Sequence, residues 1–420
     1  MLSFITIYIL PFLCIGFLPF FEDAYDTGRF IIVTGITILM CLLWTIRLIR
    51  TKRLIVSYNA GVVGFGVLTL ASLLSIIFVS TNKIEALVHP LGFITWLSLT
   101  LIALIAPTSI EKKDHNKLMW MVVGVSSLLG LLIIYQQFGI TAMLFPTLSF
   151  LASPLWNPTG TPISACYLLT LSIPLGMYLL RESGKNHEDR NSAFALIAIL
   201  IAVSGIAMTL WRYIPMMKTS LLPFPVGWGI LLESWKQPIH TIMGVGVDQF
   251  TMAYTLGKQL SINTTTIWNS GFNTNASFLL HIATVNGFLG ICSLFLFVLV
   301  LVRSHISIIG LRIALFLTIL FLFFFPPSFP LVILLSLFCI LISSKDSTHV
   351  YHLTSLGVVF GSIVCMGVIF VSSYLWYRYT KGEQLFFQGV VAKNQENNGT
   401  KAYNLMILAM RQNPFISRYH

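Results

Sequence analysis

Residues 277–302 read SFLLHIATVNGFLGICSLFLFVLVLV and contain no Asp, Glu, Lys or Arg. A helix needs about 20 apolar residues to cross the hydrocarbon layer of a membrane, so this segment alone is long enough to span one. Ten further apolar segments lie near 2–20, 29–48, 60–80, 88–106, 118–138, 161–180, 192–211, 308–325, 329–343 and 353–377. The pattern predicts an all-α, polytopic membrane helical bundle with about 11 transmembrane helices.

The composition excludes a soluble enzyme. Of the 420 residues, 56% are hydrophobic and only 9% are charged, and the mean hydropathy is +0.86. Soluble domains carry about 25% charged residues. The net charge of +11 is not evidence for nucleic-acid binding, because a basic excess in a membrane protein usually marks the loops on its cytoplasmic face.

The distribution of basic residues predicts the orientation of the chain. If the N-terminus is cytoplasmic, 13 of the 25 Lys and Arg residues fall in the inside loops. The short outside connections then hold two, Arg29 and Lys83, the long loop holds four and the tail holds six. The positive-inside rule therefore places the long loop and the C-terminal tail on the extracytoplasmic side.

Two segments allow alternatives. The first span could be mistaken for a signal peptide, although no small-residue cleavage pattern precedes Glu22. The ninth and tenth spans, separated by the proline-rich turn 325–330, could form a hairpin or a re-entrant pair. The six cysteines all fall inside predicted spans without metal or redox spacing, and they are interpreted as small core hydrophobes.

The spans lack the charged residues of a coupled transporter. No Asp or Glu lies inside any of the 11, which disfavours proton-coupled transport and a charge-lined channel. The chain also contains no nucleotide-binding loop, zinc-binding His motif or nucleophile elbow, and no metal or other cofactor is expected. Any chemistry is therefore expected at the outer surface.

The long loop, residues 211–276, is the part of the chain where that chemistry is expected, because a loop of this length is usually functional. After two prolines, Trp228, Leu231, Leu232 and Trp235 recur at helical spacing on one predicted face, with Glu233 turned away. That face suits a helix lying in the membrane interface, or equally one that packs on the outer ends of the spans.

Three motifs follow in a fixed order. Gly244-Val-Gly246 precedes Asp248, Asn275 lies just before the next span, and that span carries Gly287-Phe-Leu-Gly290. As a phosphate-binding pair the first two glycines are a weak signal, because no strand-turn-helix unit surrounds them. The small residues of the span favour close helix approach instead.

The order of these pieces resembles the bacterial O-antigen ligase and O-antigen polymerase superfamily. In that family a Trp-bearing helix is followed by PxxGxGxxxF, by HNxxL and by GxxG, and the likeness is sharp over about 211–303. The segment Trp156-Asn-Pro-Thr-Gly-Thr-Pro162 is also similar to an outer turn of the family. The resemblance implies a metal-independent GT-C class membrane glycosyltransferase of the cell envelope, acting in polysaccharide or lipopolysaccharide biosynthesis. Its partners would be an undecaprenyl-pyrophosphate-linked glycan and an acceptor glycan or lipid.

The resemblance also implies site residues. Arg212 matches a family arginine, and cations must stabilise the charge that builds on the pyrophosphate. We therefore predict Arg212 and Asp248 as catalytic residues, the latter as the base for the acceptor. The predicted donor-binding residues are Lys218, Gly244, Gly246 and Asn275. The catalytic assignment depends on whether Arg212, Lys218 and Asp248 converge on a lateral, lipid-facing cavity beneath the loop.

Each of these roles has an alternative. Arg212 and Lys218 could be ordinary interface anchors, and Asp248 could be a solvated or capping residue. Glu233, His240 and His281 are further candidate bases, although His281 suits a satisfied helix position better.

The sequence departs from the family at one point. Its His-Asn pair falls on Ala276 and Ser277, so the histidine is absent. The chain must therefore use another group, act by positioning alone, or be a divergent member. A non-catalytic member or a polysaccharide transport or assembly protein is the alternative function.

The predicted domain organisation is a membrane domain, residues 1–380, and an extracytoplasmic helical tail, residues 381–420. Residues 384–393 are predicted as a helix separate from the last span. In the tail, Ala402, Leu405, Met406 and Ala409 keep helical spacing, and the pattern up to Pro414 resembles the start of a tetratricopeptide repeat. About three such repeats are needed to bury a core, so the tail suits either part of a longer repeat array or a docking surface for a protein partner.

Overall fold

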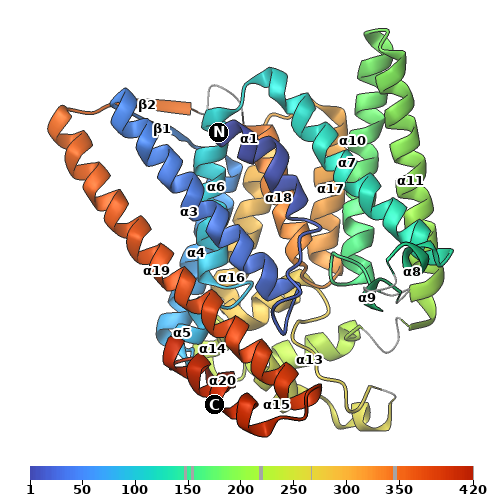
Figure 1. Ribbon diagram of the computed structural model, residues 1–420, viewed down its shortest axis with the longest axis vertical. Coiled ribbons are helices and arrows are strands. Elements are labelled where there is room, and N and C mark those ends of the chain that lie inside the picture. Colours follow the sequence, from blue (N-terminus) through green and yellow to red (C-terminus); the bar gives the residue numbers. More distant parts are fainter. Residues whose placement is uncertain (146–148, 153–155, 217–220, 266, 344–347, 420) are drawn as a thin grey trace.

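Antiparallel helices that run between two ends of the molecule form the body of the chain (Figure 1). The computed structural model describes residues 1–145, 149–152, 156–216, 221–265, 267–343 and 348–419. The helices of the bundle are the consecutive segments α1 (Leu2–Phe4), η1 (Ile5–Ile9) and α2 (Leu10–Phe12), then α3 (Asp26–Thr51), α4 (Ala60–Phe78), α6 (Phe93–Ile105), α7 (Lys112–Gln137), α10 (Pro162–Lys185), α11 (Asp189–Tyr213), α16 (Phe278–Arg303), α17 (Ile309–Phe324), α18 (Phe329–Ile342) and α19 (Ser355–Asn394).

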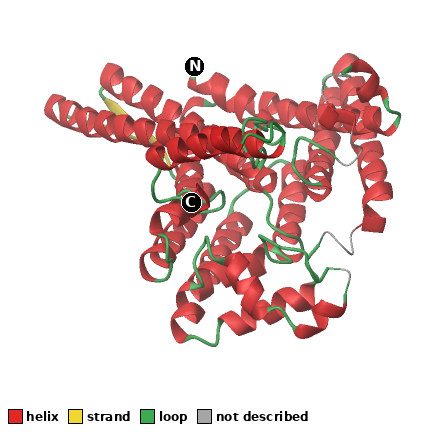
Figure 2. Cartoon of the chain, turned by 60° about the horizontal axis from the view of Figure 1, so that its bottom comes forward, coloured by secondary structure: helices red, strands yellow, loops and turns green. Residues whose placement is uncertain are grey.

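Shorter elements connect these helices. They are η2 (Ala106–Ser109), α5 (Lys83–Leu87), α8 (Ile140–Leu144), α9 (Ser149–Ala152), η3 (Ile214–Met216), α13 (Phe224–Ser234), α14 (Pro238–Met243), α15 (Phe250–Gly257), η4 (Leu260–Thr264), α20 (Gly399–Gln412) and η6 (Ser417–Tyr419). Figure 2 shows that the connections are themselves mostly short helices joined by turns.

The chain has the architecture of a multi-pass membrane protein. Within the described ranges, seven helices are long and apolar enough to cross a membrane, and the shorter apolar helices are Leu2–Phe12, Phe93–Ser109, Ile309–Phe324 and Phe329–Ile342. Each predicted span therefore contains a helix. Helix α18 is short, but almost all of its residues are buried, so it lies within the bundle and is apolar on every side.

Glycines allow the helices to approach closely. A Cβ atom on Gly64 of α4 would lie 1.9 Å from the Phe297 ring of α16, and one on Gly130 of α7 would lie 2.7 Å from Ile201 of α11. In lipid, helices associate through such small-residue contacts, because no hydrophobic force draws them together. The two contacts tie α4 to α16 and α7 to α11.

A two-stranded antiparallel sheet closes one end of the bundle, called the sheet end below. Strand β1 (Arg53–Ser57) pairs with β2 (Thr348–His352), with Arg53 opposite His352 and Ser57 opposite Thr348. The two strands lie far apart in the sequence, and the all-helical prediction did not include them. The sheet joins the segment after α3 to the segment before α19.

Helix α19 overturns one detail of the sequence analysis. It continues for 40 residues, from Ser355 to Asn394, so the last span and the helix predicted for 384–393 are a single rod. The boundary proposed at residue 380 falls inside this helix. No proline interrupts the segment, and Gly382 and Gly389 alone do not break it.

The tail turns back onto α19. Helix α20 packs antiparallel against the end of α19, where Gly389 would place a Cβ 3.2 Å from Met406 (Figure 1). Beyond it, the Ser417 amide and hydroxyl donate to Glu85 of α5. Helices α19 and α20 form a helical hairpin, which is docked on the opposite end of the bundle from the sheet. That end is called the loop end below.

A buried acidic group holds the tail in place. Glu383 is 1% exposed and accepts hydrogen bonds from Arg418 and from the Tyr419 hydroxyl. Removing one partner of a buried pair leaves an uncompensated charge, which destabilises a protein strongly. Because the Arg418 side chain is itself 35% exposed, we expect Arg418→Ala to weaken tail docking by only about 2 kcal/mol.

Limited proteolysis of the purified full chain measures this loss. We expect the Arg418→Ala protein to be cleaved faster in the turn at 395–398 than wild type. The matched control is Arg411→Ala, because the Arg411 side chain is exposed and only its carbonyl is used, by Arg378. Equal cleavage of the two variants would contradict the role given to Glu383.

Candidate functional site

The long loop folds into a lobe at the loop end of the bundle. Its helices α13, α14 and α15 lie against the start of α16 (Figure 1). Residues of the lobe and of α16 share a small apolar core, namely Leu222, Ile230, Leu231, Phe250, Ala253, Tyr254, Ala276, Leu280, Ala283 and Val285. The loop is therefore a packed unit that presents its side chains from fixed positions.

The face predicted for α13 is wrong in part. Leu231 is buried and the Trp235 indole donates to the Ala283 carbonyl at 3.3 Å, but Trp228 and Leu232 are about half exposed. The helix packs through a narrower side, because Gly227 allows close contact with Asn275. The exposed apolar side chains of α13 are Phe224, Trp228 and Leu232, spaced four residues apart. One side of α13 thus packs on the spans, and the other suits a membrane interface.

The glycine pair anchors the lobe in the bundle. Helix α16 is broken at Gly287, where φ is +64° and ψ is −153°. The break frees carbonyls of α16, and the lobe satisfies them: the Val245 amide donates to Thr284 at 2.9 Å and the Gly246 amide donates to Val285 at 3.2 Å. A broken transmembrane helix is tolerated where neighbouring backbone re-satisfies its polar groups in this way.

This packing removes the phosphate-binding role predicted for Gly244 and Gly246. The Gly244 amide donates to the His240 carbonyl at 2.8 Å, so all three amides of the segment are already used. Gly244 has a φ of +79°, and a Cβ there would lie 2.2 Å from the Val285 carbonyl. The glycines are required for close backbone contact and leave no donor for a ligand.

Asn275 is also structural. It is completely buried, and its amide nitrogen donates to the Thr284 hydroxyl at 3.0 Å and to the Gly227 and Leu280 carbonyls at 3.3 and 3.4 Å. Its side-chain oxygen accepts from the Ala276 amide at 2.7 Å. Because its donors and acceptor are used within the protein, the predicted contact with a glycan donor is not supported.

Asp248 lies between the lobe and the end of α4. Its Oδ2 accepts a hydrogen bond from the side-chain Nε2 of Gln249 at 2.7 Å. Its Oδ1 is buried without a hydrogen-bond partner among the described residues. Burial raises the pKa of the Asp248 carboxyl above its usual range, and the hydrogen bond from Gln249 acts in the opposite direction. Burial therefore makes the charged form of Asp248 less favourable in the folded chain than in water.

This burial predicts a pH effect. Because the pKa of Asp248 is higher in the folded than in the unfolded chain, the group stabilises the fold at low pH, and that contribution is lost as the pH rises through the folded pKa. The isosteric variant Asp248→Asn stays neutral. We expect it to match wild type below about pH 4 and to unfold at a higher temperature than wild type at neutral pH.

Thermal unfolding in detergent across this pH range tests the expectation. The control is Glu22→Gln, which removes an exposed carboxylate that forms no hydrogen bond or ion pair among the described residues. A neutral-pH gain of the same size in both variants would show that net charge, and not the burial of Asp248, is responsible.

His281 occupies the helix position expected for it. The side chain is 1% exposed, its Nδ1 accepts from the Asn275 amide at 3.4 Å, and its ring lies 5.3 Å from that of Phe250. Its Nε2 has no partner among the described residues. His281 lies one turn into α16 and contacts Asn275, which precedes the helix.

Arg212 lies in a narrow cavity at the end of α11. The cavity, of about 20 Å³, is lined by Gln136, Gln137, Trp156, Asn157, Thr209 and Tyr213 among others. No hydrogen bond or ion pair joins the Arg212 guanidinium to another described residue. A water needs roughly 10–15 Å³, so the cavity admits one water-sized group such as a phosphate oxygen. Lys218 lies outside the described residues.

Arg29 was missed as a site residue, because the sequence analysis counted it as a loop charge. It begins the second turn of α3, is completely buried and donates through Nη2 to the Pro158 carbonyl. Its Nη1 lies 3.7 Å from Asp26, yet Nη1 and Nε make no hydrogen bond among the described residues. The signal in the sequence was a cation at the first residue of a span, where a charge is costly.

The turn 156–161 lies between the two arginines and is called the outer turn below. Gln136 donates to the Trp156 carbonyl at 2.9 Å from the side of Arg212, and Arg29 binds Pro158. Gly160, with a φ of +89°, packs against Tyr25. These contacts bring Arg212 and Arg29 to one turn, where Arg29 is paired with Asp26.

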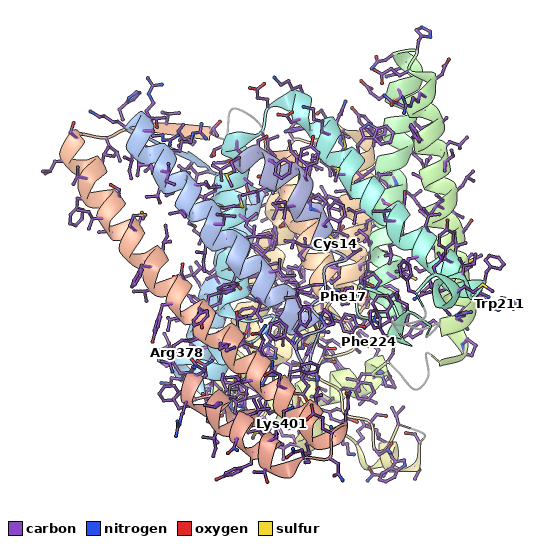
Figure 3. The ribbon with its side chains drawn as sticks, viewed as in Figure 1. Cys14, Phe17, Trp211, Phe224, Arg378 and Lys401 are labelled. Carbon is purple, nitrogen blue, oxygen red and sulfur yellow. The ribbon has the colours of Figure 1, made fainter. Side chains whose placement is uncertain are left out.

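Arg212 and Asp248 do not converge. Figure 1 places the end of α11 on the opposite side of the molecule from α4 and α14, and Figure 3 shows Trp211, the neighbour of Arg212, at the outer edge of that side. Asp248 instead lies close to Ser80, next to Gly246. Within the described ranges, no three His, Cys, Asp or Glu side chains gather into a group that could hold a metal ion.

Comparisons of the chain with models of known families, with characterised proteins and with solved structures gave no match.

Proposed function

We propose that the chain transfers a glycan from an undecaprenyl-pyrophosphate donor to a saccharide or lipid acceptor, as O-antigen ligases and polymerases do. The reaction takes place at the extracytoplasmic face of the bacterial cytoplasmic membrane. The proposal rests on the order of motifs in residues 211–303 and on the place of Arg212. The buried Arg29 and the outer turn add to it.

The proposed topology has 11 spans, with the N-terminus in the cytoplasm and the C-terminus outside. It counts the four shorter apolar helices together with the seven long ones, and an odd number of spans puts the two termini on opposite sides. Support comes from the Lys and Arg residues, of which 13 belong to loops assigned to the sheet end. The lobe, the outer turn and the tail then face the periplasmic space.

The Arg212 guanidinium, which has no partner among the described residues, is the observation that carries the proposal. When the glycosidic bond to the donor breaks, negative charge develops on the departing pyrophosphate. Arginine stabilises such charge well, because its planar fork matches two phosphate oxygens and it stays protonated. The cavity beside Arg212 is too small for a sugar, so the sugar would remain outside it while a phosphate oxygen enters.

Neither Asp248, the predicted base, nor His281 acts on the acceptor hydroxyl in this proposal. Asp248 is too far from Arg212 to act on the same reacting atoms, and His281 is buried under Phe250. Glu233, another candidate base, is paired with Lys236 at 2.7 Å, and transfer in this chain is proposed to rely on positioning the acceptor and on stabilising the leaving group. The tail hairpin, which leaves Tyr403 and Leu408 exposed, is proposed as the surface for a protein partner.

Reconstitution tests the proposed reaction. The full chain in liposomes would receive a purified undecaprenyl-pyrophosphate-linked oligosaccharide and a candidate acceptor. We expect a new glycosylated product and an equal amount of released undecaprenyl pyrophosphate, both measured by mass spectrometry. Folded protein that releases no undecaprenyl pyrophosphate with any acceptor tested would favour the alternative, a transport or assembly protein.

A further inference from the structure

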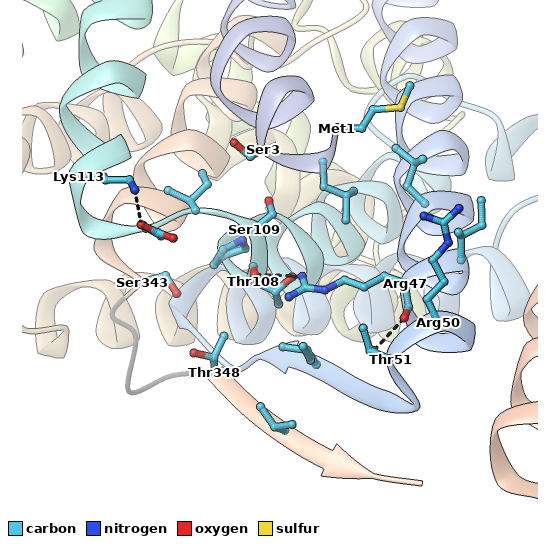
Figure 4. Close-up of a pocket in the computed structure, with 18 of the residues that line it drawn as sticks. Met1, Ser3, Arg47, Arg50, Thr51, Thr108, Ser109, Lys113, Ser343 and Thr348 are labelled. Carbon is cyan, nitrogen blue, oxygen red and sulfur yellow. Dashed lines mark hydrogen bonds and ion pairs between the residues drawn. The ribbon is translucent and has the colours of Figure 1, made fainter. Parts of the chain in front are cut away.

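A cavity of about 920 Å³ opens at the sheet end of the bundle, opposite the outer turn (Figure 4). The last turns of α3 form one wall, η2 and the start of α7 form another, and the two strands lie across it. Neither the predicted site residues nor the outer turn takes part. The cavity is more than large enough for a phosphate together with part of a larger molecule.

Cations dominate the cavity. Arg47 reaches across it and donates through Nη1 to the Thr108 carbonyl at 3.2 Å, which fixes its direction. Arg50 lies one turn further along α3 and forms no ion pair among the described residues. Lys113 pairs with Glu111 at 2.8 Å, so these two charges cancel. Among the described residues, the Arg47 and Arg50 guanidinium groups form no ion pair, and two such charges suit an anion.

The same wall is apolar one turn deeper in the membrane. Leu43 precedes Arg47 by four residues and Ile46 precedes Arg50 by four, so each arginine lies directly beyond an apolar side chain on the same face of α3. The cavity thus offers carbon contacts toward the membrane and cations toward its surface. An amphiphile with a phosphate at its polar end matches both halves of this wall.

We propose that this cavity binds the phosphate of an anionic phospholipid of the leaflet at the sheet end. Arg47 and Arg50 bind the phosphate oxygens, and Leu43 and Ile46 contact the start of the acyl chains. Basic pockets between membrane helices bind anionic head groups in this manner. The proposal does not depend on glycan transfer at the loop end.

Native mass spectrometry of the delipidated full chain tests the proposal, with phosphatidylglycerol, phosphatidylethanolamine and inorganic phosphate as probes. We expect phosphatidylglycerol to bind more tightly than the zwitterionic lipid. Arg47→Gln/Arg50→Gln should weaken it by about 10-fold or more, because each surface arginine contributes on the order of 1 kcal/mol to anionic lipid binding. Arg50→Gln alone should weaken it less, and it keeps the Arg47 contact with Thr108.

The matched control is Lys52→Gln/Arg53→Gln, which removes the same charge at the same end from residues outside the cavity. Equal weakening in the control would overturn the proposal, because general surface charge would then explain binding. Equal affinity for the two lipids would also overturn it. Displacement of the lipid by inorganic phosphate at millimolar concentration would reassign the cavity to a free phosphate and would overturn the lipid assignment.

Discussion

An Arg212→Ala protein is expected to transfer glycan at least about 100-fold more slowly than wild type, at saturating donor and acceptor. Removing one preorganised donor from a site where charge develops typically has an effect of this size. The guanidinium has no partner among the described residues, so no ion pair is broken by the change. The expected loss is therefore in kcat, with little change in folding.

Two further variants separate charge from geometry at this position. Arg212→Lys keeps the positive charge and loses the planar fork, so its rate should fall between those of wild type and Arg212→Ala. Lys236→Ala is the control, because Lys236 is exposed and pairs with Glu233 at 2.7 Å in the same lobe. A wild-type rate in folded Arg212→Ala, measured as released undecaprenyl pyrophosphate, would rule out Arg212 as the donor ligand.

Gly244→Ala is expected to destabilise the fold strongly. At Gly244 φ is +79° and ψ is −172°, a region that only glycine adopts readily, and the new Cβ would lie 2.2 Å from Val285. Backbone strain of this kind costs about 1–3 kcal/mol and overpacking costs a similar amount. Their sum, about 4 kcal/mol, is a large part of the 5–15 kcal/mol that stabilises a typical protein.

Gly287→Ala should have the same effect, because its Cβ would lie 2.4 Å from the Gly244 amide nitrogen. The control is Gly361→Ala, since Gly361 lies in α19 with nothing within 4 Å of its added Cβ. Size-exclusion chromatography and thermal unfolding of the three variants in detergent provide the measurement. A well-folded Gly244→Ala protein would show that the lobe does not depend on the crossing at the α16 break.

Most of the fold was predicted from the hydropathy of the sequence. Each apolar segment became a helix, because in a membrane the backbone must satisfy its own hydrogen bonds. The strands Arg53–Ser57 and Thr348–His352 were missed, since their pairing partners lie almost 300 residues apart and each strand is short. The length of α19 was also not predicted. The last span was ended at Tyr377, before the charged residues, but the helix continues through them to Asn394.

The candidate site was harder to predict than the fold. Gly244, Gly246 and Asn275 were assigned to a ligand because of their order in the chain, yet their hydrogen-bonding groups are used within the protein. Whether these groups are used within the protein depends on where α16 breaks, and no local sequence pattern predicts the position of that break. Arg29 contacts a turn 129 residues away, so its burial is a property of the packed bundle. Arg212 stays a prediction, and its assigned role awaits the transfer assay.

Because α19 is continuous, the last span and the first part of the tail form one helix. At a rise of 1.5 Å per residue, the apolar stretch from Leu356 to Leu375 is about 30 Å long, close to the hydrocarbon thickness of a bilayer. Directly after this stretch, the Trp376 indole donates to the Ile31 carbonyl of α3 at 2.9 Å. Ser417, at the far end of the tail, donates to Glu85 of α5. The tail is therefore held between a fixed point on α3 and a fixed point on α5, and its position is set by the bundle at both ends.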